Sequence, residues 1–167
     1  YTGFYKDGHK DDLWESFYEN GQLESIKSFR NGDKDGIWKH YYEDSQLKES
    51  GSFKYGNKDG LWELYYVNGQ FEEIRNYTDG MLDGSSKSYY KNGQLKESGS
   101  FKYGNKDGLW ETYYEDGHIK ESEIYKHGIL HKLRTTYFEN GKVKDSEVYK
   151  DGKRHGTFQS FYKNGQL

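Results

Sequence analysis

The chain of 167 residues lacks proline and cysteine altogether and contains only one methionine. Without cysteine, disulfides, thiolate catalysis and cysteine-based metal sites are excluded. No run of apolar residues is long enough to cross a bilayer or to form the apolar part of a signal peptide. The absence of proline favours regular strand pairing, but it leaves edge strands without one common protection against edge-to-edge association. We therefore expect that end-to-end self-association is possible.

Hydrophobic residues are also scarce. They make up only 31% of the chain, while charged residues make up 32%. A mean hydropathy of -1.27 would by itself suggest disorder. However, 18 Tyr, 9 Phe and 4 Trp make 19% of the chain aromatic, and each such ring can bury a large area while its polar edge stays hydrated. The composition therefore predicts a folded, aromatic-rich protein.

The chain also lacks a large excess of charge of either sign. The 25 basic and 28 acidic residues are interspersed and give a net charge of -3. No strong field attracts nucleic acid or an anionic membrane surface. We expect no nucleic-acid partner, and charge does not support membrane association.

A period of 24 residues organises the whole chain, as self-similarity at fixed spacing does in repeat proteins. In each copy an aromatic residue precedes a glycine by three positions. The aromatic residues are Tyr5, Phe29, Phe53, Tyr77, Phe101, Tyr125 and Tyr149, and the glycines are Gly8, Gly32, Gly56, Gly80, Gly104, Gly128 and Gly152. Seven copies form one continuous array, at about 1–23, 24–47, 48–71, 72–95, 96–119, 120–143 and 144–167. Because the chain begins at Tyr1 and stops within a copy, we expect it to be a fragment of a longer protein.

Each copy has two strand-like stretches and two turn signals. Asn-Gly and Asp-Gly pairs such as Asn20-Gly21 predict tight type I′ turns, which need positive φ at both central residues. The other signal, as in "YGNKDG" from Tyr55 to Gly60, predicts a longer connection with glycine at both ends. These features predict an all-β fold: an elongated, twisted antiparallel meander of seven 24-residue β-hairpins with about 14 strands in a single-layer sheet.

Alternation along the strand 61–66 predicts two aromatic faces. One face carries the tryptophans Trp14, Trp38, Trp62 and Trp110, which we interpret as structural packing together with the glycines Gly32, Gly56, Gly80, Gly104, Gly128 and Gly152. The other face carries a half-exposed aromatic row of Phe17, Tyr41, Tyr65, Tyr89, Tyr113, Tyr137 and Phe161. Between these rings a charge alternates from copy to copy, as Glu15, Lys39, Glu63, Lys87 and Glu111. Because Tyr is enriched at protein interfaces, the half-exposed row is our candidate binding site.

The stretches "GSFKYGNKDGLWELYYVNGQ" (51–70) and "YKDGKRHGTFQSFYKNGQL" (149–167) resemble MORN repeats. They are most similar to a bacterial variant of the repeat that occurs in YwqK-like antitoxins. The resemblance implies one β-hairpin per repeat and roles in scaffolding, membrane attachment, dimerisation or, for the bacterial variant, toxin neutralisation. Ser86 and Arg134 depart from the pattern, because they stand where other copies place Trp.

No catalytic constellation stands out, because nearly every polar residue recurs with the period of the repeat. His127 and His131 are four residues apart, but they flank Gly128 and lack the glutamate of a metalloprotease motif. Adjacent carboxylates such as Glu72 and Glu73 point to opposite faces of a strand. We expect no enzymatic activity, no metal and no cofactor.

The sequence therefore predicts a non-enzymatic scaffold for protein–protein interaction, with an antitoxin or immunity protein as a narrower version. The alternative is a bacterial cell-surface module whose exposed aromatic rows bind a glycan, choline or a host protein. The first would place the protein in the cytoplasm and the second at the surface, so localisation stays open.

Overall fold

The computed structural model describes residues 1–167, and every regular element in it is a β-strand. The chain divides into two compact units, residues 1–81 (unit 1) and residues 82–167 (unit 2). No helix in the structure has the length and apolar character needed to span a membrane.

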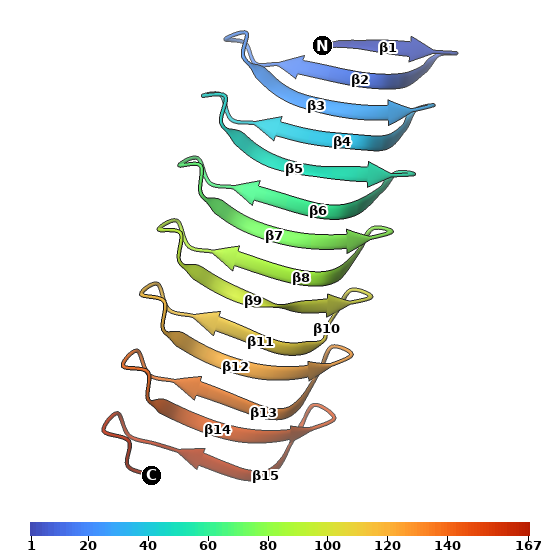
Figure 1. The fold of residues 1–167 in the computed structure, drawn as a ribbon. Coiled ribbons are helices and arrows are strands. Elements are labelled where there is room, and N and C mark those ends of the chain that lie inside the picture. The colour runs from blue at the N-terminus through green and yellow to red at the C-terminus, as the bar shows by residue number, and fades with distance from the viewer. The chain divides into compact units, whose positions relative to one another are not determined.

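Unit 1 is an antiparallel meander in which each strand pairs with the next one along the chain (Figure 1). The ladder between β4 and β5, for example, runs from the pair Gly36 and Phe53 to the pair Tyr41 and Leu47. The strands of unit 1 are β1 (Thr2–Lys6), β2 (His9–Phe17), β3 (Leu23–Arg30), β4 (Asp33–Tyr41), β5 (Leu47–Lys54), β6 (Asn57–Tyr65) and β7 (Phe71–Thr78).

Unit 2 has the same antiparallel plan (Figure 1). Its strands are β8 (Met81–Tyr89), β9 (Leu95–Lys102), β10 (Asn105–Lys106), β11 (Gly108–Tyr113), β12 (Ile119–Lys126), β13 (Ile129–Tyr137), β14 (Val143–Lys150) and β15 (Lys153–Ser160). Both β10 and β11 pair with β9, and the interruption falls at Asp107, whose N–H donates to the carbonyl of Ser100 at 2.9 Å. The predicted all-β fold of antiparallel hairpins is confirmed.

The tight turns are not where the sequence predicted them. Lys54 pairs directly with Asn57, so Tyr55 and Gly56 form a two-residue loop, with φ of 49° and 81°. Positive φ at both central residues is what a type I′ turn requires. The same signature occurs at residues 7–8, 31–32, 79–80, 103–104, 127–128 and 151–152. Our prediction of a longer connection here was wrong.

The Asn-Gly connections are three-residue loops instead. The N–H of Tyr18 donates to the carbonyl of Gln22 at 2.8 Å, and the N–H of Gly21 donates to the carbonyl of Tyr18 at 2.9 Å. Gly21 has a positive φ of 83°, whereas Asn20 does not have a positive φ. This is the pattern of a turn followed by one left-handed residue. The prediction of type I′ turns at Asn-Gly was therefore also wrong.

In several copies the second glycine lies inside a strand, at a β-bulge. In β4, Gly36 has φ of 98°, and the register with β3 shifts where Trp38 pairs with Lys27 and Lys34 with Phe29. Asp12 and Lys132 replace this glycine in their copies and also have positive φ, of 62° and 68°. A bulge bends its strand and increases the local twist.

Hydrogen bonds from the tight turns connect consecutive repeats. The N–H of Gly32 donates to the carbonyl of Lys10 at 2.8 Å, and the N–H of Gly56 donates to the carbonyl of Lys34 at 2.8 Å. The carboxylate of Asp11 also accepts the N–H of Asn31 at 3.0 Å. Each turn is thus held by the strand of the preceding copy, as expected for a repeat array in which neighbours stabilise one another.

Candidate functional site

The two faces of each meander differ in how their aromatic residues are packed. We call the side that carries Trp14 and its equivalents the Trp face. The opposite side, which carries Leu13, Glu15 and Phe17 and their equivalents, we call the Leu face, because side chains alternate along a strand.

On the Trp face, the indoles are buried although the sheet is a single layer. Trp62 is 1% exposed and Trp110 is 3% exposed. A Cβ added at Gly51 or Gly99 would overlap the indole of Trp62 or Trp110, respectively, so a glycine on the preceding strand lets each ring lie against the backbone. The rings also pack edge-to-face with neighbouring aromatics, as between Phe53 and Trp62 at 5.1 Å.

Trp38 is less enclosed than the other three tryptophans, because Lys27 stands in place of the glycine. Trp38 pairs with Lys27 on the preceding strand and is only half-buried. The ammonium of Lys27 lies 4.8 Å from the centroid of the Trp38 ring. Trp14, Trp62 and Trp110 are buried as a packing role requires, whereas Trp38 is more exposed.

Each tryptophan also carries an ammonium group from a lysine four residues earlier in the chain. These contacts are attractive cation–π interactions. The ammonium-to-centroid distances are 4.3 Å for Lys10 and Trp14, 4.5 Å for Lys34 and Trp38, 3.7 Å for Lys58 and Trp62, and 4.1 Å for Lys106 and Trp110. Where Ser86 and Arg134 replace the tryptophan, Leu82 and Leu130 replace the lysine. The lysine and the tryptophan thus vary together within this one chain.

Arg134 forms an ionic cluster where the other copies place an indole. Its guanidinium pairs with Glu121, with Glu123 at 3.3 Å and with Glu147 at 3.9 Å. Glu147 is 5% exposed and also pairs with Arg154 at 3.1 Å. Burial acts to lower the pKa of Arg134, but these carboxylates together outweigh burial, so the pKa is raised. The sixth copy is therefore packed by charge pairing instead of by aromatic contacts.

The predicted half-exposed row lies at the ends of the long strands. Phe17 is 44% exposed, whereas the other six members are half-buried. The hydroxyl of Tyr65 donates to Glu63 at 2.9 Å, and burial together with this hydrogen bond raises the pKa of Tyr65 to about 12. Its hydroxyl stays protonated at neutral pH and holds the Glu63 carboxylate in place.

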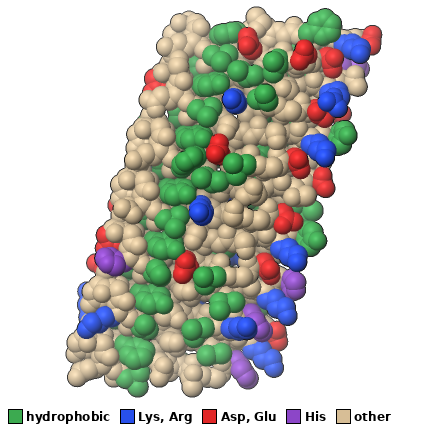
Figure 2. Space-filling model, viewed as in Figure 1, with side chains coloured by type: hydrophobic (Ala, Val, Ile, Leu, Met, Phe, Trp, Pro, Cys, Tyr) green, Lys and Arg blue, Asp and Glu red, His purple; other side chains and the backbone are tan.

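Sequence reasoning missed an aliphatic row on the same face. Its members directly precede the tryptophan position, and this Gly-Leu-Trp or Gly-Ile-Trp pattern was the available signal. They are Leu13, Ile37 and Leu61 in unit 1, at 47, 48 and 48% exposed, and Leu109 and Leu133 in unit 2, at 52 and 44% exposed. Figure 2 shows hydrophobic side chains gathered in a band that crosses the strands of each unit, with single acidic and basic side chains among them.

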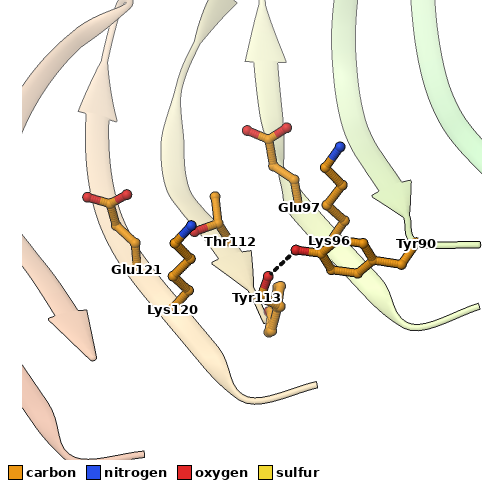
Figure 3. Close-up of a pocket in the computed structure, with 7 residues that line it drawn as sticks. All are labelled: Tyr90, Lys96, Glu97, Thr112, Tyr113, Lys120 and Glu121. Atoms are coloured by element: carbon orange, nitrogen blue, oxygen red, sulfur yellow. Dashed lines mark hydrogen bonds between the residues drawn. The ribbon is translucent and has the colours of Figure 1, made fainter. Parts of the chain in front are cut away.

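A hollow of about 250 Å³ lies in unit 2 between β9, β11 and β12 (Figure 3). Its lining residues are Tyr90, Lys96, Glu97, Thr112, Tyr113, Lys120 and Glu121. The hydroxyl of Tyr90 donates to the backbone carbonyl of Tyr113 at 2.7 Å, and this bond recurs 24 residues later from Tyr114 to Tyr137 at 2.9 Å. These tyrosines connect consecutive repeats, so the hollow is part of the repeat architecture.

The histidines flanking Gly128 contribute to a second, smaller hollow of about 190 Å³. Lys126, His127, Ile129, His131 and Asp151 line it. No three His, Asp or Glu side chains of the chain are grouped closely enough to hold a metal ion. This hollow is therefore lined by charged side chains, those of Lys126 and Asp151, but it holds no set of metal ligands.

Comparison with known proteins agrees with the repeat pattern. No curated protein matches the chain. The family model described as MORN repeat variant matches six segments, residues 13–31, 34–55, 82–103, 106–127, 130–151 and 154–167. The later segments begin at steps of 24 residues, as the tight turns do. The chain therefore belongs to the MORN repeat variant family and is a repeat scaffold.

Proposed function

We propose that this scaffold is non-enzymatic and binds a protein partner through the Leu face. The observation that carries the proposal is the aliphatic row of unit 1. Leu13, Ile37 and Leu61 are each about half exposed and recur on alternate strands of one sheet. Aligned apolar side chains bordered by polar groups are typical of protein interaction surfaces.

The Trp face offers less to a partner, because the chain itself fills it. Three of its indoles lie against a glycine of the preceding strand, and all four are covered by the ammonium groups of Lys10, Lys34, Lys58 and Lys106. A quaternary ammonium ligand such as choline would have to displace these lysines. This argues against the choline-binding version of a cell-surface module, and retention on a choline or glycan column would restore it.

Crosslinking in the native cell tests the proposed function. We expect a specific protein adduct on the wild-type chain, and we expect it to be lost when Leu13, Ile37 and Leu61 are all changed to serine. The matched control changes three apolar residues of similar or greater exposure outside the Leu face, Tyr55, Val67 and Tyr103. The proposal fails if no specific adduct forms, or if the control removes the adduct as completely as the serine variant does.

The narrower version is an antitoxin-like immunity protein. It rests on the sequence resemblance to YwqK-like antitoxins. A toxin gene beside the full reading frame, with co-purification of its product, is the expected finding. A reading frame with no such neighbour and no toxin binding would eliminate this version while leaving the scaffold proposal intact.

A further inference from the structure

The hollow between β9, β11 and β12 has the hydroxyl of Thr112 among its lining groups. On β11, Thr112 stands directly opposite Glu97 of β9 and Glu121 of β12. Because it follows Trp110 by two residues, its side chain points to the Trp face. The hydroxyl is half-buried and makes no hydrogen bond within the chain. A hydroxyl both donates and accepts hydrogen bonds, so this one is available to a ligand.

Neither neighbouring carboxylate takes this hydroxyl, because each is held by another donor. Glu97 accepts the indole N–H of Trp110 and pairs with Lys106 at 3.7 Å. Glu121 accepts the Nε–H of Arg134 at 2.6 Å. Both carboxylates that strand pairing places beside the hydroxyl are therefore engaged elsewhere.

Two lysines flank the hydroxyl and have no acidic partner of their own. Figure 3 shows Thr112 between Lys96 and Lys120. Both lysines are exposed, take part in none of the ion pairs, and lie 5.9 and 5.8 Å from the ring centroids of Tyr90 and Tyr114, respectively. Their strands are about 10 Å apart, on either side of β11. Flexible lysine stems can bring both ammonium groups to one ligand.

The next repeat shows which chemical group this arrangement holds. There Thr136 lies on β13, between the strands that carry Lys120 and Lys144. Its hydroxyl donates to the carboxylate of Asp145 at 3.0 Å, and Asp145 stands directly opposite it on β14. A carboxylate of the chain itself thus binds the hydroxyl in one repeat, whereas the equivalent hydroxyl of the preceding repeat has no such partner.

We propose that the hollow around Thr112 binds a carboxylate of a partner polypeptide, from an aspartate or glutamate in an acidic segment. The hydroxyl donates to a carboxylate oxygen, as Thr136 does to Asp145, and the ammonium groups of Lys96 and Lys120 supply the opposite charge. This site faces away from the Leu face, so it is a second binding site that goes beyond the proposed function.

Unit 1 lacks the combination that makes this site. The positions equivalent to the two lysines carry Glu24, Lys48 and Glu72 there, so no two consecutive copies have a lysine. Leu64, which has no hydroxyl, stands at the threonine position between Lys48 and Glu72. The pair of lysines around a hydroxyl is therefore a property of unit 2 and is not required by the repeat itself.

Nuclear magnetic resonance of the purified, ¹⁵N-labelled chain tests the inference, with a tetraglutamate peptide as the probe. We expect saturable shifts of the amide signals of Thr112 and Lys120, and none with tetraglutamine. Lys96→Gln with Lys120→Gln should weaken binding about fivefold or more, and Thr112→Val should weaken it about threefold. Lys102→Gln with Lys126→Gln makes the same charge change at the other ends of β9 and β12 and should leave binding unchanged.

A further variant should create a second site in the next repeat. Asp145→Ala removes the carboxylate that holds the hydroxyl of Thr136, while Lys120 and Lys144 stay in place. Tetraglutamate should then also shift the amide signal of Thr136. Circular dichroism shows that each variant is folded before it is titrated.

Shifts that do not saturate overturn the inference, as do equal shifts with tetraglutamine. A control pair that weakens binding as much as the change of Lys96 and Lys120 also overturns it, and so does an Asp145→Ala variant with no new shift at Thr136. Phosphatidylserine vesicles are the competing ligand. If they bind through Lys96 and Lys120 while the peptide does not bind, the site takes a lipid surface and the inference is wrong. The proposed function is tested separately, because its crosslinked adduct depends on the Leu face.

Discussion

Ser45 is the one residue that replaces glycine in the three-residue loops. Its φ of 68° is left-handed, like the φ of 83° at Gly21 in the first copy. A side chain in this region costs about 1–2 kcal/mol, because its Cβ crowds the following carbonyl. The residue is tolerated because the hydrogen bonds of the loop, such as Ser45 N–H to the Tyr42 carbonyl at 2.9 Å, are all made.

We therefore expect Ser45→Gly to raise the free energy of unfolding by about 1 kcal/mol. Urea denaturation monitored by tryptophan fluorescence measures the change. Gly21→Ser is the reciprocal variant, because a Cβ there meets no atom within 4 Å, and it should lose a similar amount. Equal stability of all three proteins would contradict the argument.

His40 makes stability depend on pH. Its Nε2 is buried without a hydrogen-bond partner, and its ring stacks on Trp38 with centroids 5.8 Å apart. Burial lowers the pKa of His40, and the charge of Lys27 adds to this, whereas Glu49 and Glu24 oppose it and Lys48 reinforces it. The unfolded chain therefore binds this proton at a higher pH than the folded chain does.

Stability contributed by neutral His40 is complete above the unfolded pKa of about 6.5. It should fall as the pH drops from there toward the lower folded pKa, because the unfolded state then holds more protons. We expect the urea midpoint to fall less steeply between pH 7 and pH 5 in His40→Gln than in the wild-type protein. Replacing the exposed His155 in the same way is the matched control, and identical slopes for all three proteins would rule out His40 as the cause.

At the scale of the element, the long strand of four of the hairpins is stabilised by one lysine and one tryptophan that act as a pair. The ammonium of Lys58 lies 3.7 Å from the centroid of Trp62 and 5.3 Å from that of Tyr77. In the fourth copy, Leu82 and Ser86 replace the lysine and the tryptophan together.

A double-mutant cycle with Lys58→Leu and Trp62→Ser tests this coupling. Lys58 also lies 3.8 Å from Glu49, but the cycle isolates the part that depends on Trp62. We expect a coupling energy of about 0.5–1 kcal/mol in thermal or urea unfolding. Additive losses would mean that the lysine and the tryptophan stabilise the strand independently.

The turns show why the elements were only partly predictable. Asn-Gly was read as type I′, but Asn20 has no positive φ, whereas Tyr55 and His127 do. Local sequence preference did not decide where the tight turn forms, because the turn at Tyr55-Gly56 is fixed by the pairing of Lys54 with Asn57. The bulge at Gly36 was missed for the same reason, since a glycine in sequence does not show whether it ends a turn or bends a strand.

At the scale of the molecule, each strand contacts mainly its sequence neighbours. We expect residues 1–81 to fold without the remainder, because stability in repeat arrays is a sum of local terms. Circular dichroism and urea unfolding of this segment should show a cooperative β-sheet transition. A segment of residues 1–70, which lacks the β7 partner of β6, should unfold at distinctly lower urea, and a disordered 1–81 segment would contradict the expectation.

The sequence by itself determined the repeat, the all-β fold and the two-faced strands, because a 24-residue period and alternation along a strand are visible in one dimension. The structure decided what each face is available for. Trp62 is covered because Gly51 and Lys58 approach it from different positions in the chain, and only the folded backbone brings them together. Leu61 stays half exposed because no second layer covers its side of the sheet, and strand pairing alone aligned Glu15, Lys39 and Glu63 beside it.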